Sequence, residues 1–233
     1  MEKTWVDEQG AVFSEDKKTL LQCPDVENYT IPDHADTVSE YAFDRAPNIR
    51  SINFNKVRKI PSRSTLVTRE VPYFNGARWE GYETEEEMHY YSLFTRCPFV
   101  EKIIFSDPYE IGLFAFAGLK NLTAFSTPNY RQFCPLVLFA SGIKELRVNG
   151  SFIEPEFKYT STFIDQEGNE YTRSAFNDIS ICFPVLEKCY INMGYPGNVI
   201  DKIARCRSLK TIILPESIKS RYNLQIQYVW GDF

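Results

Sequence analysis

The sequence predicts an α/β solenoid of about seven stacked repeats, wound as a right-handed superhelix. The first observation is a short phrase with apolar residues at its first, fourth and sixth positions. The copies of this phrase begin at Val26, Ile49, Val100, Leu122, Ile143, Leu186 and Leu209. One copy is imperfect, because Thr127 stands in an apolar position of the phrase that begins at Leu122.

The spacing of the copies is the second observation. Successive copies begin 23, 51, 22, 21, 43 and 23 residues apart. A period of about 20 to 29 residues with this apolar pattern is the signature of a leucine-rich repeat. The two long spacings contain additional sequence, at 61–90 and 151–182. A third observation supports the register: phenylalanine stands six residues before the phrase at Phe43, Phe94 and Phe116.

Several short segments resemble the BspA-type leucine-rich repeat. They are Ile31-Pro32-Asp33, Val38–Phe43, Ile111-Gly112, Ala115–Gly118 and Ile213–Ile218. The resemblance covers most of 11–60, 91–150 and 183–220, and it fails in the two insertions. It implies the architecture and the presence of terminal caps, and it implies kinship with proteins that are often found on cell surfaces.

The ends of the single domain, residues 1–233, are predicted to be capped, because a solenoid exposes an apolar face at each end. Residues 1–25 are predicted to form the amino-terminal cap, in which two short strands flank the polar turn Ser14–Lys18. Residues 215–233 are predicted to form the carboxyl-terminal cap. In this cap Tyr222–Trp230 alternates apolar and polar side chains, as a last strand would.

The first insertion, residues 61–90, is predicted to be a loop followed by a helix. Proline and glycine mark its first half as a loop, and Thr84–Glu87 resembles a capping box ahead of apolar residues at helical spacing. Tyr73, Arg78 and Trp79 are candidate binding residues, since aromatic and arginine side chains on loops are typical anchors. The alternative is that the aromatic side chains only pack the loop onto the solenoid.

The second insertion, residues 151–182, is predicted to contain a β-hairpin at 157–173. Phe157–Ile164 alternates with period two, and Asp165–Asn169 has the composition of a turn. The hairpin is expected to stand off the solenoid, either as an interaction arm or as a cover for a sheet edge. An unpaired strand edge would also permit self-association through this hairpin.

The residues between the apolar positions of each phrase are predicted to project outward from the strands. The last of these columns contains four candidate binding residues, which are Ile104, Arg147, Tyr190 and Ile213. Exposed apolar side chains that cluster on such a surface would mark an interface. The alternative is that the mixed charges of the neighbouring columns form ordinary cross-strand pairs.

Composition excludes several function classes. The net charge of −5 is opposite to that of a nonspecific nucleic-acid binder, and no apolar run is long enough to insert into a membrane. The chain has no glycine-rich phosphate loop and no two histidines four residues apart. We therefore expect no cofactor, no metal and no catalytic residue, and we interpret the six cysteines as small buried apolar residues.

These observations predict a non-enzymatic interaction scaffold that binds another protein. One alternative is a cell-surface adhesin that binds host matrix protein or carbohydrate, and a second is an enzyme with a site between the two insertions. The first residues lack the apolar segment of a secretory signal. This absence favours a cytoplasmic location, whereas a cell-surface or secreted location would apply if a signal had been removed.

Overall fold

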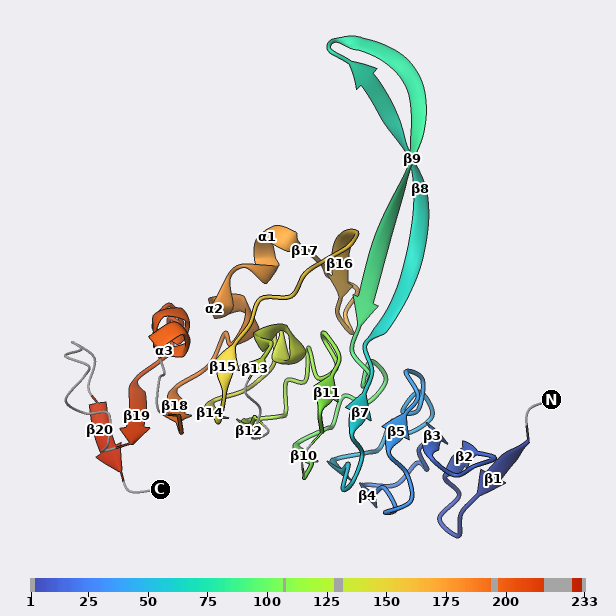
Figure 1. The fold of residues 1–233 in the computed structure, drawn as a ribbon, viewed down its shortest axis with the longest axis vertical. Coiled ribbons are helices and arrows are strands. Elements are labelled where there is room, and N and C mark those ends of the chain that lie inside the picture. The colour runs from blue at the N-terminus through green and yellow to red at the C-terminus, as the bar shows by residue number, and fades with distance from the viewer. Residues whose placement is uncertain (1–2, 107, 128–131, 194–196, 216–227, 232–233) are drawn as a thin grey trace.

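The computed structural model describes residues 3–106, 108–127, 132–193, 197–215 and 228–231. Short strands form a row that runs from β1 at one end to β20 at the other (Figure 1). A long hairpin, made of β8 and β9, rises from the middle of this row (Figure 1). We call this hairpin the arm, and we call the remainder of the described chain the repeat body.

One strand of each repeat pairs in parallel with a strand of the next repeat. These strands are β4 (Asn28–Thr30), β6 (Ser51–Asn53), β10 (Lys102–Ile104), β12 (Ala124–Ser126), β14 (Glu145–Val148), β18 (Lys188–Ile191), β19 (Thr211–Pro215) and β20 (Tyr228–Gly231). They form two ladders, in the orders β4-β6-β10 and β12-β14-β18-β19-β20. The middle apolar residues of the phrase lie level with one another in each ladder. Tyr29, Ile52 and Ile103 are level in the first ladder, and Phe125, Leu146, Cys189 and Ile212 are level in the second.

A second row of shorter strands lies further along each repeat. It consists of β1 (Thr4–Val6), β2 (Val12–Ser14), β3 (Thr19–Gln22), β5 (Thr37–Val38), β7 (Lys59–Ile60) and β11 (Glu110–Ile111), with β13 (Gln132–Phe133) and β15 (Ser151–Phe152) as a separate pair. The first three strands pair antiparallel and the later ones pair parallel. The antiparallel strands β1, β2 and β3 therefore occupy the amino-terminal end of the row (Figure 1).

The core lies between the two rows and is rich in phenylalanine. The rings of Phe43 and Phe94 stack with their centroids 4.4 Å apart, although 51 residues separate them in the chain. Phe54 packs edge-on against both rings. Thr127 is buried in place of an apolar residue, and its hydroxyl accepts a hydrogen bond from the backbone N–H of Asn149 at 2.9 Å. The imperfect copy of the phrase is thus accommodated without an unsatisfied polar group.

The helices are short and lie on the side of the repeat body from which the arm rises (Figure 1). They are a 3-10 helix η1 (Pro135–Leu138) and three α-helices, α1 (Arg173–Phe176), α2 (Ile179–Cys182) and α3 (Gly197–Ile203). None of the helices in the described ranges is long and apolar enough to cross a membrane.

The prediction of a loop and a helix for residues 61–90 is wrong. This segment forms the arm, in which β8 (Arg63–Asn75) pairs antiparallel with β9 (Arg78–Tyr91). Gly76, with a φ of +63°, and Ala77 form its two-residue loop, and glycine at the first position is typical of such tight hairpins. Thr84–Glu87 is not a helix cap, because its residues pair with the partly β-branched segment Val67–Glu70 of β8.

The second insertion contains a β-hairpin, but the hairpin does not stand off the repeat body. β16 (Thr160–Ile164) pairs antiparallel with β17 (Glu170–Thr172) and parallel with the base of β9. The sheet order is β17-β16-β9-β8, so both edges of β16 are occupied. Phe163 is fully buried. The two insertions are therefore joined into one sheet, and the hairpin covers an edge of the arm.

The predicted carboxyl-terminal cap lies mostly outside the described residues, which omit 216–227 and 232–233. The backbone of β20 pairs in parallel with β19 and ends the ladder of the described strands. The prediction of a last strand within Tyr222–Trp230 is therefore tested only at Tyr228–Trp230, which are extended.

Neighbouring repeats approach so closely that one glycine is required by contact. A Cβ atom at Gly142 would lie 1.9 Å from the carbonyl oxygen of Lys120 in the preceding repeat. The Gly142→Ala substitution should lower the free energy of unfolding by about 1–3 kcal/mol or more, because backbone atoms must move apart. Chemical denaturation measures this loss.

Ser141 provides a matched control for this prediction. Its buried hydroxyl has no hydrogen-bond partner among the described residues. Ser141→Ala removes that unsatisfied group, so the free energy of unfolding should stay the same or rise by up to about 1 kcal/mol. If both variants lost the same free energy of unfolding, the close contact between repeats at Gly142 would not be the cause.

Candidate functional site

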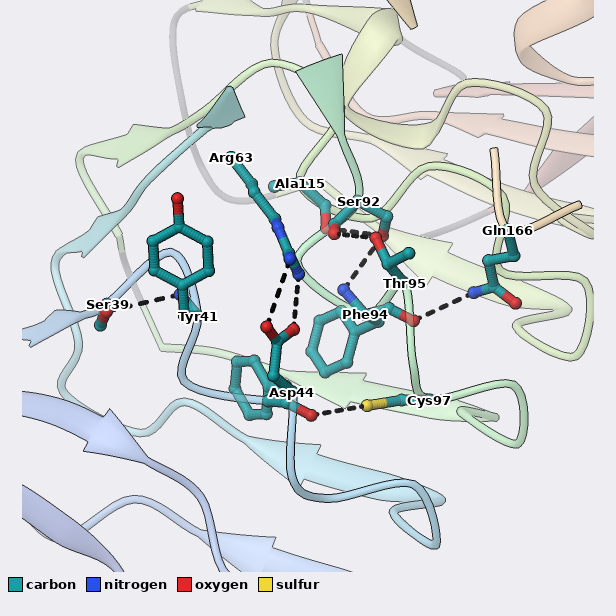
Figure 2. Close-up of polar contacts among 11 residues, drawn as sticks. Ser39, Tyr41, Asp44, Arg63, Ser92, Phe94, Thr95, Cys97, Ala115 and Gln166 are labelled. Atoms are coloured by element: carbon teal, nitrogen blue, oxygen red, sulfur yellow. Dashed lines mark hydrogen bonds and ion pairs between the residues drawn. The ribbon is translucent and has the colours of Figure 1, made fainter. Parts of the chain in front are cut away.

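The arm is fixed to the repeat body at its base by a buried ion pair. Arg63, the first residue of β8, donates two hydrogen bonds to the Asp44 carboxylate, at 2.5 and 3.2 Å (Figure 2). The guanidinium also lies 4.9 Å from the ring centroid of Tyr41. Both side chains of the ion pair are mostly buried. A two-point contact of this kind sets the direction of β8 as well as its position.

The returning strand is fixed in the same region. The Ser92 hydroxyl donates to the carbonyl of Ala115 at 3.3 Å and accepts from the N–H of Phe94 at 3.2 Å (Figure 2). Gln166, in the turn of the second insertion, donates to the Phe94 carbonyl at 3.0 Å. Cys97 completes the group with a thiol contact of 3.2 Å to the carbonyl of Phe43.

A polar cluster joins the arm to β16 just above this base. The buried Glu87 carboxylate of β9 accepts a 2.5 Å hydrogen bond from the Thr162 hydroxyl of β16. Arg69 lies 3.5 Å and His89 lies 3.7 Å from the same carboxylate. The hydrogen bond from Thr162, followed by the charges of Arg69 and His89, holds the pKa of Glu87 below its usual value.

A cluster of aromatic rings lies beneath the joined insertions. Phe114 of the repeat body stacks on Phe163 of β16, with centroids 4.8 Å apart and planes at 12°. Tyr90 of β9 packs at 5.2 Å from the same Phe114 ring, and Phe176 of α1 packs at 5.0 Å. These rings bury the apolar side of both insertions, so the arm rises from a rigid base.

The far end of the arm has the opposite character, because its large aromatic side chains are exposed. Tyr73, Phe74, Trp79 and Tyr82 are 43%, 53%, 56% and 67% exposed. Trp79 and Tyr82 contact each other edge to face, with centroids 6.0 Å apart. Arg78 is also exposed beside the loop. The predicted residues Tyr73, Arg78 and Trp79 therefore all lie near the end of the arm, with Trp79 paired opposite Phe74. Phe74 and Tyr82 are also exposed there, although the candidate list did not include them.

The outer part of the arm is acidic. Residues 70–86 contain five glutamates and one arginine, which gives a net charge of −4 for this segment. The glutamates are Glu70, Glu80, Glu83, Glu85 and Glu86. Like charges on neighbouring side chains repel one another, and a positively charged partner would relieve that repulsion.

The other predicted residues lie on the strand face of the repeat body, away from the end of the arm. The Arg147 guanidinium lies 4.1 Å from the ring centroid of Tyr190, and the Lys188 ammonium lies 4.7 Å from it. Ile104 is 39% exposed on a different ladder. The prediction that Ile213 is exposed is wrong, since it is only 8% exposed. In β19 the consecutive residues Ile212, Ile213 and Leu214 are all buried, so both faces of this strand are covered.

The six cysteines are buried free thiols, and burial raises the pKa of each one, which keeps it protonated. In the part of the chain that the structure describes, no group of three or more His, Cys, Asp or Glu side chains is arranged to hold a metal ion.

Comparison with known proteins gives one family match and one similar structure. The family model of the BspA type leucine rich repeat region matches residues 13–66 and 87–181 in six copies. It thus includes most of the second insertion, where the resemblance is predicted to fail, and omits 183–220. The crystal structure of the pneumococcal vaccine antigen PcpA is similar over 99% of this chain, with 14% identity and a TM-score of 0.47. The chain spans 48% of that antigen's length, and no curated protein matches it in sequence.

The contact between Glu87 and Thr162 predicts a pH dependence at the base of the arm. Because the folded pKa of Glu87 lies below its usual value of 4.5, its stabilising effect is complete above that pH and is lost as the pH falls through the folded pKa. Thr162→Val should weaken the β16–β9 pairing by about 1.5–3 kcal/mol at neutral pH and by less in acid. Amide hydrogen exchange of β16 and β9 measures the difference.

Thr160→Val is the matched control for that experiment, since Thr160 lies on the same strand and is exposed. It should leave both the exchange rates and their pH dependence nearly unchanged. A carboxyl titration by NMR should show the pKa of Glu87 rising in Thr162→Val. An unchanged pKa would show that the Thr162 hydroxyl does not hold the ionised form.

Proposed function

Because the chain belongs to the BspA-type leucine-rich repeat family, we propose that it is a non-enzymatic module that recognises another protein through its arm. The family typically supplies protein-binding or adhesin modules. One observation carries the specific proposal: a hairpin with four exposed large aromatic side chains at its end is clamped at its base by Arg63, Ser92 and Glu87.

The chemistry of the arm's end suits a protein interface. Aromatic and arginine side chains dominate the binding energy of most protein interfaces, because they bury much area and lose little rotamer entropy. Tyr73, Phe74, Trp79 and Tyr82 would bury this area on binding. The rigid base supports the proposal, since a preformed arm orders fewer groups when the partner arrives.

The charge of the arm points to a partner with a basic surface. Its outer segment, residues 70–86, has a net charge of −4, whereas the net charge of the whole chain is −5. Opposite charge on the partner would accelerate association and make it weaken with added salt. The family match says nothing of this charge, so the preference rests on the arm alone.

The strand face is proposed as a secondary contact surface. Arg147 and Tyr190 form an exposed or half-exposed pair on neighbouring strands, and Ile104 adds apolar area elsewhere on the face. We propose that the repeats continue as one right-handed solenoid of about seven coils. The parallel, level strands of both ladders support this proposal.

Self-association through 157–173 is less favoured by the contacts of β16, which has a strand on each side. The two edges of that sheet are β17, a strand of only three residues within 157–173, and β8, which contains Pro72. Proline cannot donate a backbone hydrogen bond and therefore protects an edge strand from pairing with another chain.

A surface adhesin that binds carbohydrate is the second candidate. The exposed edge-to-face pair of Trp79 and Tyr82 favours it, because sugar rings stack on aromatic faces of this kind. An uncharged oligosaccharide would not select the acidic segment. The salt dependence of binding therefore separates the two candidates.

Replacing the aromatic end should weaken binding without unfolding the chain. The double variant Trp79→Ala/Tyr82→Ala should weaken binding to the partner by about 2 kcal/mol or more, as expected for aromatic anchors. Partners are captured from lysate and from extracellular matrix, identified by mass spectrometry, and measured individually by titration at two salt concentrations. Both side chains are exposed, so thermal unfolding should be unchanged.

Tyr109→Ala is the matched control, because Tyr109 is 63% exposed on the repeat body and lies outside the arm. It should retain full affinity for the same partner. If every partner bound the double variant as tightly as the unaltered chain, recognition through the arm would be wrong. Binding that depends on the arm but not on salt would favour the carbohydrate candidate.

A further inference from the structure

A cleft of about 400 Å³ lies beside the second insertion, on the side of the repeat body that carries the helices. It is bounded by η1, by the segment 153–157, by α1 and α2, and by residues at the end of α3. A volume of this size is typical of sites for small organic molecules. The lining contains no residue of the arm, so this cleft is separate from the surface described above.

The charges that line the cleft are predominantly positive. Arg173, Lys202 and Arg205 line it together with a single acid, Glu154. The described lining therefore has a net charge of +2, whereas the whole chain has a net charge of −5. A local reversal of sign at a concave surface concentrates anions there.

The one acid of the lining is already paired with one of these cations. Glu154 lies 2.9 Å from the Lys202 ammonium, and this hydrogen bond holds the pKa of Glu154 below its usual range. The Glu154 side chain is 80% exposed, whereas that of Lys202 is 27% exposed. Lys202 therefore belongs to the cleft wall, and Glu154 covers it from the solvent side. An entering anion can replace Glu154 at Lys202.

Apart from Asn177, the rest of the lining consists of apolar side chains and two cysteines. Phe157 and Phe176 pack against each other with ring centroids 5.5 Å apart, and Ile153, Leu136 and Ile179 complete the wall. Cys134 and Cys182 add two thiols whose pKa is raised by burial, so they remain uncharged. Such a wall favours a ligand with an apolar body.

We propose that this cleft binds a small amphipathic carboxylate, with the carboxylate held by Arg173, Arg205 and Lys202 and the apolar body against Phe157 and Phe176. Arginine presents a planar fork of donors that matches a carboxylate, and two arginines with one lysine provide more donors than one carboxylate can use. The carboxylate can come from a free aryl or alkyl acid or from the terminal residue of a peptide. The proposal does not depend on the arm.

Binding is tested with three carboxylates on the full chain. The probes are octanoate, 3-phenylpropionate and N-acetyl-phenylalanine, each compared with its neutral amide by calorimetry and ligand-observed NMR. At least one acid should bind saturably, and its amide should bind at least about tenfold more weakly, because a hydrogen bond to a charged group is lost. N-acetyl-phenylalanine represents a peptide terminus, so the preferred probe identifies the source.

Two pairs of neighbouring residues supply matched variants. Arg205→Ala should weaken binding at least about tenfold. Arg207→Ala should leave it unchanged, because Arg207 is exposed and does not line the cleft. Both arginines lie near Asp178, whose pKa is lowered mainly by Ser180 and further by both arginines. Each variant therefore removes one positive charge near Asp178, but only Arg205→Ala removes a residue that lines the cleft.

The second pair tests the competition at Lys202. Glu154→Gln should make binding about two- to fivefold tighter, the range that a partly exposed ion pair allows. Glu156→Gln, at an exposed residue outside the lining, should have no effect. The proposal is overturned if no acid binds saturably, if acids and amides bind alike, or if Arg205→Ala and Arg207→Ala have equal effects.

Discussion

This structure depends on one constraint, the in-register parallel pairing of strands from successive repeats. Each repeat contributes a strand of only a few residues, and such a strand is stable only because the next repeat lies about 4.8 Å away. Backbones at that spacing leave no room for a side chain at Gly142, and they leave no room for additional sequence inside the stack. Inserted residues must therefore leave the stack between two of its strands and rejoin it so that the next strand keeps its register. Residues 63–91 do so as the arm.

The apolar phrase predicts the repeat body well because burial acts on each repeat in the same way. Ile52, Leu146 and Ile212 could be assigned to level positions from spacing alone, since a one-residue slip would expose them. Ile213 was misjudged for a related reason. The phrase indicates on which face of the strand Ile213 lies, but it contains no information about what packs against that face.

The arm was harder to predict because it pairs with itself. Met88, Tyr91 and Phe94 have helical spacing, yet Met88 and Tyr91 lie opposite β8 residues and Phe94 belongs to the core. The sequence did contain one usable signal, the glycine at the start of a two-residue loop between β-branched and aromatic segments. The aromatic and arginine composition marked Tyr73, Arg78 and Trp79 as candidates, and all three side chains are exposed on the arm. The contact between Glu87 and Thr162 joins residues 75 apart, and no local pattern predicts it.

The arm is held at its base, so its far end moves when the base rotates. Its strand β8 has 13 residues, so it extends about 43 Å from the base. A rotation of about 5° at the base would move the far end by about 4 Å over that length. The position of the aromatic end is therefore determined by a few polar contacts far from it. Any change in these contacts that rotated the base by that angle would therefore displace the aromatic end by about the size of a side chain.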